Sequence, residues 1–297
     1  MSSNEWFTGF FTTESVQTAL LVGGFVAAVA AVVGVFTVVR GQSFAGHALA
    51  DLGAVGGSAS FLLGISQLWG FVGAGVLAAL LMEAIGIRRI QGRDVATGVI
   101  LGFGLGLTSL LLYLATTNGS GAAHDATVSV LFGSLFVIDR ALVPVVVALG
   151  LVALALVAAM YRWLQLDLVD HDLATAAGVR VRLSGCAFLI ALALAVELSS
   201  LTIGVILSTA LLIGPPATAL LVTRRLSTAI LLSVVLGVAA TWLGCLLSYE
   251  SHYWAGTHGN WPVSFCIVTL VFLAYLLARV VSAGRRRHVP VAVPVPS

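Results

Sequence analysis

Two polar side chains four residues apart, His47 and Asp51, are the first candidates for chemistry in this sequence. In a helix this spacing places both side chains on one face, with their Cβ atoms about 5–6 Å apart. An imidazole nitrogen and a carboxylate oxygen could then meet one divalent cation, and zinc, manganese or iron(II) would suit this pair equally well. Two ligands are too few for a tight structural site. The alternative is that the two side chains only pair with each other.

Three further residues are candidates for lining a pathway through the protein. Glu197 lies in an apolar segment, where a carboxylate serves either a structural pair or a pathway, and the sequence leaves both open. Pro215 and Pro216 interrupt another apolar run, and because proline removes a backbone donor they are expected to kink or break a helix. Broken helices in membranes usually line a cavity, although a kink without a binding role fits as well.

The elements that position these residues are expected to be membrane-spanning helices. Of the 297 residues, 60% are hydrophobic and only 9% are charged, and the mean hydropathy is +1.10. Nine apolar runs have about the length that a spanning helix needs. They are residues 16–39, 48–66, 69–87, 94–116, 141–163, 181–198, 202–222, 227–249 and 262–283. The predicted fold is an all-α polytopic transmembrane bundle in one domain, residues 1–284, followed by a disordered cytoplasmic tail, residues 285–297.

Arginine positions predict the orientation of the bundle. All fourteen basic residues are arginines, and short cytoplasmic loops are enriched in basic residues. An external N-terminus and a cytoplasmic C-terminus place every arginine inside except Arg140. Arg140 follows a partly apolar segment, residues 124–138, which could dip back into the protein.

Glycine spacing predicts close helix packing. Gly53 and Gly57, and likewise Gly98, Gly102 and Gly106, recur every four residues and so place small residues on one helical face. Such faces are common in membrane proteins and do not indicate a substrate.

Several functions are excluded or disfavoured by what the sequence lacks. It contains no lysine, and a nucleotide-hydrolysing P-loop needs one, so the chain is not itself an ATPase. Cys186, Cys245 and Cys266 are too scattered for a zinc ligand set or a disulfide framework. Neither His-Glu-x-x-His nor Gly-x-Ser-x-Gly occurs, so we expect no enzyme activity and no cofactor bound by this chain.

Three segments resemble one family, the permease subunits of zinc, manganese and iron(II) ABC importers. Residues 40–51 read RGQSFAGHALAD, similar to a family signature in which Arg and Ser-Phe precede Gly-Asp-x-x-x-His. Residues 210–219 read ALLIGPPATA, similar to Ala-Leu-Leu-x-x-Pro-Ala-Ala-Thr-Ala, and residues 170–179 resemble a cytoplasmic Asp-x-x-x-Ala-x-x-x-Gly element. The chain departs from the family at one point: His47 precedes Asp51, whereas the family usually has the aspartate first.

The resemblance implies a transporter in a bacterial plasma membrane, with a divalent metal ion as substrate. It implies a cytoplasmic subunit that binds ATP, an extracytoplasmic metal-binding protein and a second permease copy, and it implies no nucleic acid. The polar connection at residues 167–179 is expected to dock on the ATPase through Asp170, Asp172, Ala174 and Gly178. A siderophore or vitamin importer of related architecture is the nearer alternative, and a secondary transporter driven by an ion gradient is a more distant one.

Overall fold

The computed structural model describes residues 13–85, 93–118, 123–169, 181–251 and 261–287, and all regular elements in these ranges are helical. The long helices are α2 (Glu14–Val39), α3 (Ser43–Leu63), α4 (Gln67–Ile85), α5 (Arg93–Asn118), α7 (Val143–Val169), α9 (Val181–Ile203), α10 (Val205–Val222), α11 (Leu226–Ser251) and α12 (Val263–Arg287). A short helix, α6 (Ala123–Phe132), and two 3₁₀ turns, η2 (Leu135–Val137) and η3 (Arg140–Leu142), connect α5 to α7.

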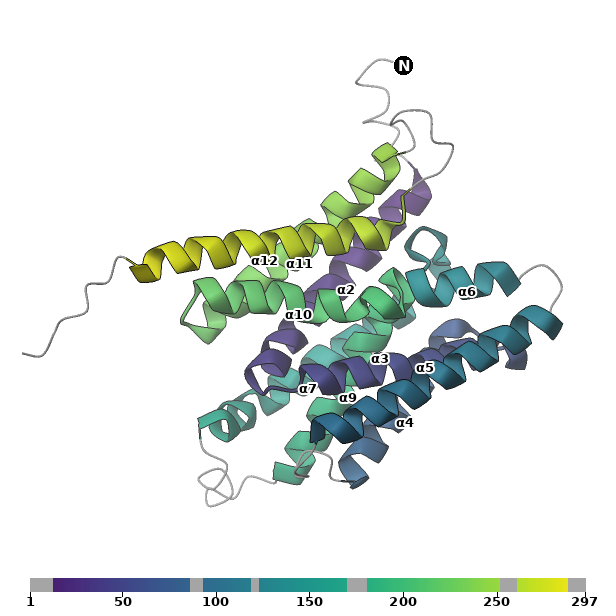
Figure 1. Cartoon of the computed structure of the whole chain (residues 1–297), viewed down its shortest axis with the longest axis horizontal. Coiled ribbons are helices and arrows are strands. Elements are labelled where there is room, and N and C mark those ends of the chain that lie inside the picture. The colour runs from purple at the N-terminus through teal and green to yellow at the C-terminus, as the bar shows by residue number, and fades with distance from the viewer. Residues whose placement is uncertain (1–12, 86–92, 119–122, 170–180, 252–260, 288–297) are drawn as a thin grey trace, which may run out of the picture.

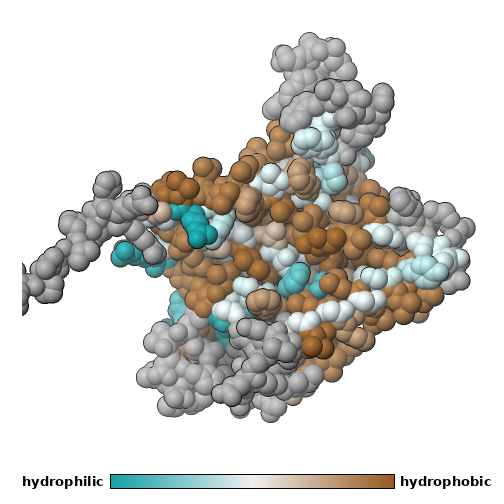
Figure 2. All heavy atoms as spheres, in the orientation of Figure 1, coloured by the Kyte–Doolittle hydropathy of each residue, from teal (hydrophilic) through white to brown (hydrophobic). Residues whose placement is uncertain are grey.

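The predicted polytopic bundle is confirmed in the described part of the chain. Eight of the helices are long and apolar enough to cross a membrane. Helix α3 has a sufficient length of 21 residues, but its small and polar residues make it less apolar than the others. Counting α3, the structure agrees with the prediction of about nine spans. Figure 2 shows apolar side chains covering most of the visible face, as expected for a surface in contact with lipid.

Two helix boundaries differ from the sequence prediction in ways that affect the site. Helix α3 begins at Ser43 rather than at residue 48, so His47 lies inside the helix. The prolines do not break their helix, because α10 continues through Pro215 and Pro216. The boundary between α9 and α10 falls at Gly204, with φ of 88°, a few residues beyond the gap that the sequence predicted between residues 181–198 and 202–222. Glycine adopts this backbone conformation without the steric cost that other residues bear.

The structure describes the C-terminal boundary of the membrane domain but not the predicted coupling element. Helix α12 continues to Arg287, three residues beyond the predicted end of the membrane domain. Residues 288–297 lie outside the described residues. So does the predicted ATPase contact, which comprises Asp170, Asp172, Ala174 and Gly178.

Helices α2 and α9 form the centre of the bundle. The buried share is 83% for Leu183–Ile203 and 72% for Glu14–Val39, against 22% for the spans in α5, α7 and α12. Figure 1 shows α11 and α12 along the upper edge of the molecule and α4 and α5 along the lower edge, with α2 and α3 between them. Helix α9 packs against α4, α7, α2, α10 and α3, so residues on all its faces contact protein.

Close approaches between helices depend on the absence of side chains. A Cβ at Gly56 in α3 would overlap with the backbone carbonyl of Gly70 in α4, and the reverse overlap holds for Gly70. A Cβ at Gly34 in α2 would overlap with the carbonyl oxygen of Leu212 in α10. Pro216 cannot donate to that carbonyl, because proline has no N–H, so the proline releases the group that packs against α2.

The connection between α5 and α7 folds back onto the bundle. Gly133, with φ of 81°, crosses the backbone at Gly204 so closely that neither residue has room for a side chain. The amide of Ser134 donates to the carbonyl of Leu201 over 3.4 Å. Leu135 is buried in a small cluster with residues of α2 and α11. Residues 127–138 therefore pack against the helices at the end of the bundle where α9 meets α10.

Candidate metal site

His47 and Asp51 lie on the same helix, α3, with the spacing that the sequence predicted. Asp51 is only 2% exposed, whereas His47 is half-buried. Among the described residues, Nδ1 of His47 and Oδ2 of Asp51 have no hydrogen-bond partner, and no ion pair joins the two side chains. The two groups are nevertheless close enough to interact electrostatically, so the pairing that the sequence left open stays open. Buried polar atoms normally have partners. A role of His47 and Asp51 in binding a metal ion stays a prediction.

Helix α5 covers Asp51 directly. The contact is made at Gly104, where an added Cβ would lie 3.4 Å from the Cβ, carbonyl carbon and carbonyl oxygen of Asp51. A larger side chain at residue 104 would push α5 away from α3. Gly104 thus lets the backbone of α5 close over the aspartate and shield it from lipid.

Glu197 enters from α9 and occupies a slot between α3 and α4. A Cβ at Gly53 in α3 or at Gly75 in α4 would overlap with the Glu197 side chain, so two glycines create the space that the carboxylate fills. Glu197 is 1% exposed, and neither carboxylate oxygen has a hydrogen-bond partner among the described residues. No structural pair with Glu197 is present among the described residues, and its role in the pathway stays a prediction.

Asp51 and Glu197 are close enough to interact electrostatically as like charges. A charged side chain near mid-bilayer costs roughly 2.5–3.5 kcal/mol on insertion scales, and two unpaired carboxylates at one level increase that cost. A divalent cation between them would offset both charges. The carboxylates and the imidazole also belong to the ligand types that manganese, iron(II) and zinc accept.

The ligands are not assembled into a closed site in this conformation. The described residues contain no group of three or more His, Cys, Asp or Glu side chains placed to hold one metal ion. Glu197 contacts α3 at Gly53, which follows Asp51 by two residues. Residues two apart lie on different faces of a helix, so the Asp51 side chain and the Glu197 carboxylate lie on different sides of α3. A cation that contacts all three side chains therefore requires movement of α3, α5 or α9.

The two prolines contribute to packing near this site. Pro215 and Pro216 are buried inside α10. One turn earlier, Leu212 contacts α3 beside His47, since a Cβ at Gly46 would lie 2.8 Å from Cδ2 of Leu212. The prolines thus place α10 against α2 and α3, and a direct role for them in the pathway stays a prediction.

Sequence reasoning did not identify the glycines that form the site. Gly53 was interpreted only as part of a packing face, and Gly75 and Gly104 carried no signal of their own. A buried carboxylate combined with glycines on neighbouring spans would be the pattern to look for. Which glycines face the carboxylate depends on which helices lie side by side. The spacing of residues along one helix does not predict which helices are neighbours.

Comparison with known proteins places the chain in a family. The family model described as "ABC 3 transport family" matches residues 12–281. The chain belongs to the ABC 3 transport family.

Family relatives include named metal permeases. The manganese import system permease protein ScaB of Streptococcus gordonii is 30% identical over 253 residues, which cover 85% of this chain and 89% of the relative. The manganese transport system membrane protein MntC of Listeria monocytogenes is 26% identical over 271 residues, covering 91% and 93%. A chain of the structure titled "PsaBC from Streptococcus pneumoniae in complex with Fab" is 26% identical, with a TM-score of 0.78 over 93% of this chain and 95% of that chain. The chain is thus similar in sequence to named manganese permeases and similar in fold to a solved structure, in each case over most of its length.

Proposed function

We propose that this chain is the permease subunit of an ATP-driven importer of divalent transition metal ions in a bacterial plasma membrane. The observation that carries the proposal is the pair of buried carboxylates, Asp51 and Glu197, which have unpartnered oxygens inside the helical bundle and are close enough to interact electrostatically. The relatives named as manganese permeases support manganese as a substrate. Zinc and iron(II) fit the same ligand types.

The open arrangement of the ligands suits transport. A cation held by one imidazole and one or two carboxylates is bound weakly enough to leave, whereas a closed four-ligand site would trap it. In this mechanism the helices bring Glu197 toward Asp51 when the cation arrives and separate them when it departs. The energy comes from ATP bound and hydrolysed on a separate cytoplasmic subunit, and an extracytoplasmic binding protein supplies the metal.

The remaining contacts of the transporter follow from the orientation. With the N-terminus outside and the C-terminus inside, residues 167–179 lie on the cytoplasmic side, and Asp170, Asp172, Ala174 and Gly178 meet the ATPase. A second copy of the permease completes the assembly. Family membership supports both contacts.

The orientation has a direct test. A reporter fused after Arg287 should read cytoplasmic, and a reporter inserted near Gly256 should read extracytoplasmic, because the arginines concentrate on the inner side. The measurement is paired alkaline phosphatase and green fluorescent protein activity in cells. Identical readings at the two positions would contradict the span count.

The metal site is tested by substitution in the complete transporter reconstituted into liposomes. We expect His47→Ala, Asp51→Ala and Glu197→Gln each to abolish manganese uptake, because each removes one of few ligands. The double exchange His47→Asp with Asp51→His should keep some transport, since it restores both ligand types on the same helix face.

The control for the site variants is Tyr113→Phe. Tyr113 is 64% exposed on the outer face of α5 and belongs to neither the buried carboxylates nor their surroundings. This variant should transport normally. Normal uptake by all three site variants, with equal amounts of protein in the membrane, would show that the buried groups are structural.

A further inference from the structure

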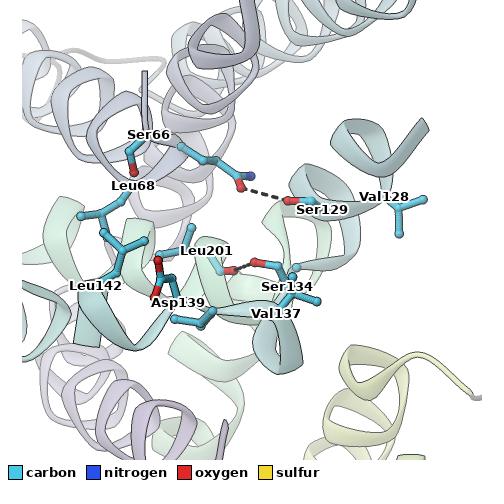
Figure 3. Close-up of a pocket in the computed structure, with 12 residues that line it drawn as sticks. Ser66, Leu68, Val128, Ser129, Ser134, Val137, Asp139, Leu142 and Leu201 are labelled. Atoms are coloured by element: carbon cyan, nitrogen blue, oxygen red, sulfur yellow. Dashed lines mark hydrogen bonds between the residues drawn. The ribbon is translucent and has the colours of Figure 1, made fainter. Parts of the chain in front are cut away.

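A cavity of about 600 Å³ lies at the end of the bundle where α9 meets α10, and it is not part of the site described above. Figure 3 shows its wall, which is built from the α3–α4 connection, α6, the turns that follow it and the last turn of α9. On the orientation proposed above, this end faces the outside of the cell.

The lining of the cavity is mostly apolar, and its polar side-chain atoms are the oxygens of five residues together with the amide nitrogen of Gln67. The oxygen-bearing side chains are Ser66, Gln67, Ser129, Ser134 and Asp139. The Ser129 hydroxyl donates to Oε1 of Gln67 over 2.9 Å, and the Ser134 hydroxyl donates to the carbonyl of Leu201 over 3.4 Å (Figure 3). No arginine or histidine is among the residues that line this cavity. Hard divalent cations prefer oxygen ligands and often keep several bound waters, which oxygen atoms can contact through hydrogen bonds.

Asp139, an exposed residue, supplies the negative charge of the cavity. Its neighbour Arg140 does not neutralise it there, because the Arg140 guanidinium is turned toward α2. Its Nη1 lies 3.2 Å from Glu14, and its Nε donates to Thr18 over 3.4 Å. Asp139 accepts one hydrogen bond, from the amide of Ala141, through Oδ1. The carboxylate keeps further acceptor capacity, because an ionised carboxylate has about four lone-pair sites.

The cavity is next to the Glu197 slot along two helices, α9 and α4, on the side of the slot nearer the proposed outer surface. Leu201 lines the cavity and follows Glu197 by four residues, which places the two side chains on the same face of α9. Leu68 also lines the cavity and precedes Gly75 by seven residues, which again gives one face of α4. Both leucines are buried, at 5% and 1% exposure. An apolar layer about one to two turns deep therefore separates the cavity from the buried carboxylate.

We propose that this cavity is the entry vestibule of the pathway, in which a hydrated divalent cation is held by Asp139 and neutral oxygens before it passes Leu68 and Leu201 to reach Glu197. The inference rests on the proposed function. A cation with six waters occupies roughly 180 Å³, since each water takes about 30 Å³, so the cavity admits the hydrated ion. The leucines exclude water from Glu197 until the helices move.

The test is protection of an engineered thiol by manganese ions. Ser134→Cys places a thiol in the cavity wall, and a membrane-impermeant cationic thiol reagent then labels it in the reconstituted transporter. Manganese chloride should slow the labelling about tenfold when its concentration is about ten times Kd, because an occupied site excludes the reagent. Choline chloride at the same ionic strength should not. If Ser134→Cys fails to insert, Ser129→Cys provides a second thiol in the same wall.

Two further variants assign the protection to the vestibule. Asp139→Asn removes the charge but keeps an N-cap residue for the following turn, so it should abolish protection without loss of insertion. Thr117→Cys carries an exposed thiol on α5 away from the cavity, and its labelling should be indifferent to manganese. The wild-type protein, with Cys186, Cys245 and Cys266, corrects for background labelling.

The outcomes separate this inference from the proposed function. If manganese does not protect the thiol, or protects equally in Asp139→Asn, the vestibule is wrong, whatever the His47 and Asp51 variants do. If protection needs the extracytoplasmic binding protein and not the free ion, the cavity is a docking surface and the inference is overturned. Protection that persists in Glu197→Gln supports the vestibule, because the assay does not depend on transport.

Discussion

Helices α9 and α5 have similar lengths in the membrane but opposite environments. The buried share is 83% for Leu183–Ile203 of α9 and 22% for Gly98–Thr117 of α5. Helix α9 has protein on every face, whereas α5 packs mainly on α3 and, at one end, on α6. On its outer face Val99 is 70% exposed and Tyr113 is 64% exposed.

The difference shows where this fold can carry a charge. Glu197 is placed on α9, where protein on all sides shields the carboxylate from lipid. The span of α5 from Gly98 to Thr117 carries no acidic or basic residue, and its contribution to the site is Gly104, which covers Asp51. Glycines therefore have different roles in the two regions: around α9 they make room for a functional side chain, and on α5 they serve close contact or face open space.

The largest effect is expected at Gly53. In Gly53→Ala the new methyl group must displace the Glu197 carboxylate, and Gly75 on the opposite side of the slot is already in close contact. Overpacking of this kind costs about 1–3 kcal/mol, and the displaced carboxylate should lower manganese uptake by more than the loss of stability explains. Thermal unfolding in detergent and uptake in liposomes measure the two effects.

The Gly53 prediction has an internal control. In the double variant Gly53→Ala with Glu197→Ala the clash is gone, so stability should return toward that of Glu197→Ala alone. A stability loss that persists in the double variant would mean that Gly53 is needed for another reason.

An intermediate effect is expected where α5 covers Asp51. Gly104→Ala adds a methyl group at an ordinary contact distance of 3.4 Å from Asp51, so it should be tolerated. Gly104→Val adds two further methyl groups at that contact and should separate α5 from α3. We expect reduced uptake and a stability loss of about 1 kcal/mol or more. Equal uptake by the two variants would show that the covering of Asp51 by α5 is unimportant for transport.

The smallest effect is expected at Gly102, on the exposed face of α5. No atom of the described residues lies within 4 Å of the Cβ position there. Gly102→Ala should leave uptake unchanged and stabilise the helix by about 0.5–1 kcal/mol, since alanine loses less conformational freedom than glycine. A loss as large as that of Gly53→Ala would remove the distinction between the central and peripheral helices.

Apolar runs alone predicted the all-α bundle and most span positions within a few residues, because an entire spanning helix must be apolar to lie in lipid. The four-residue spacing also placed His47 and Asp51 on one helix correctly. The apolar runs also separated α9 from α10, although the predicted gap, residues 199–201, lies a few residues before Gly204. The helix break that the two prolines favoured is not formed. Helix α10 continues through its prolines, and the carbonyl released by Pro216 packs against Gly34 of a neighbouring helix.

By itself, the sequence determined what each segment is: apolar helices, with one imidazole and two carboxylates at positions that lipid would not tolerate. Only the tertiary structure decided which helices are neighbours, and so it alone placed Glu197 of α9 between Gly53 of α3 and Gly75 of α4. The physical reason is that hydropathy acts on each span separately. Helix pairing depends instead on side-chain shape at contacts between residues that are far apart in the chain.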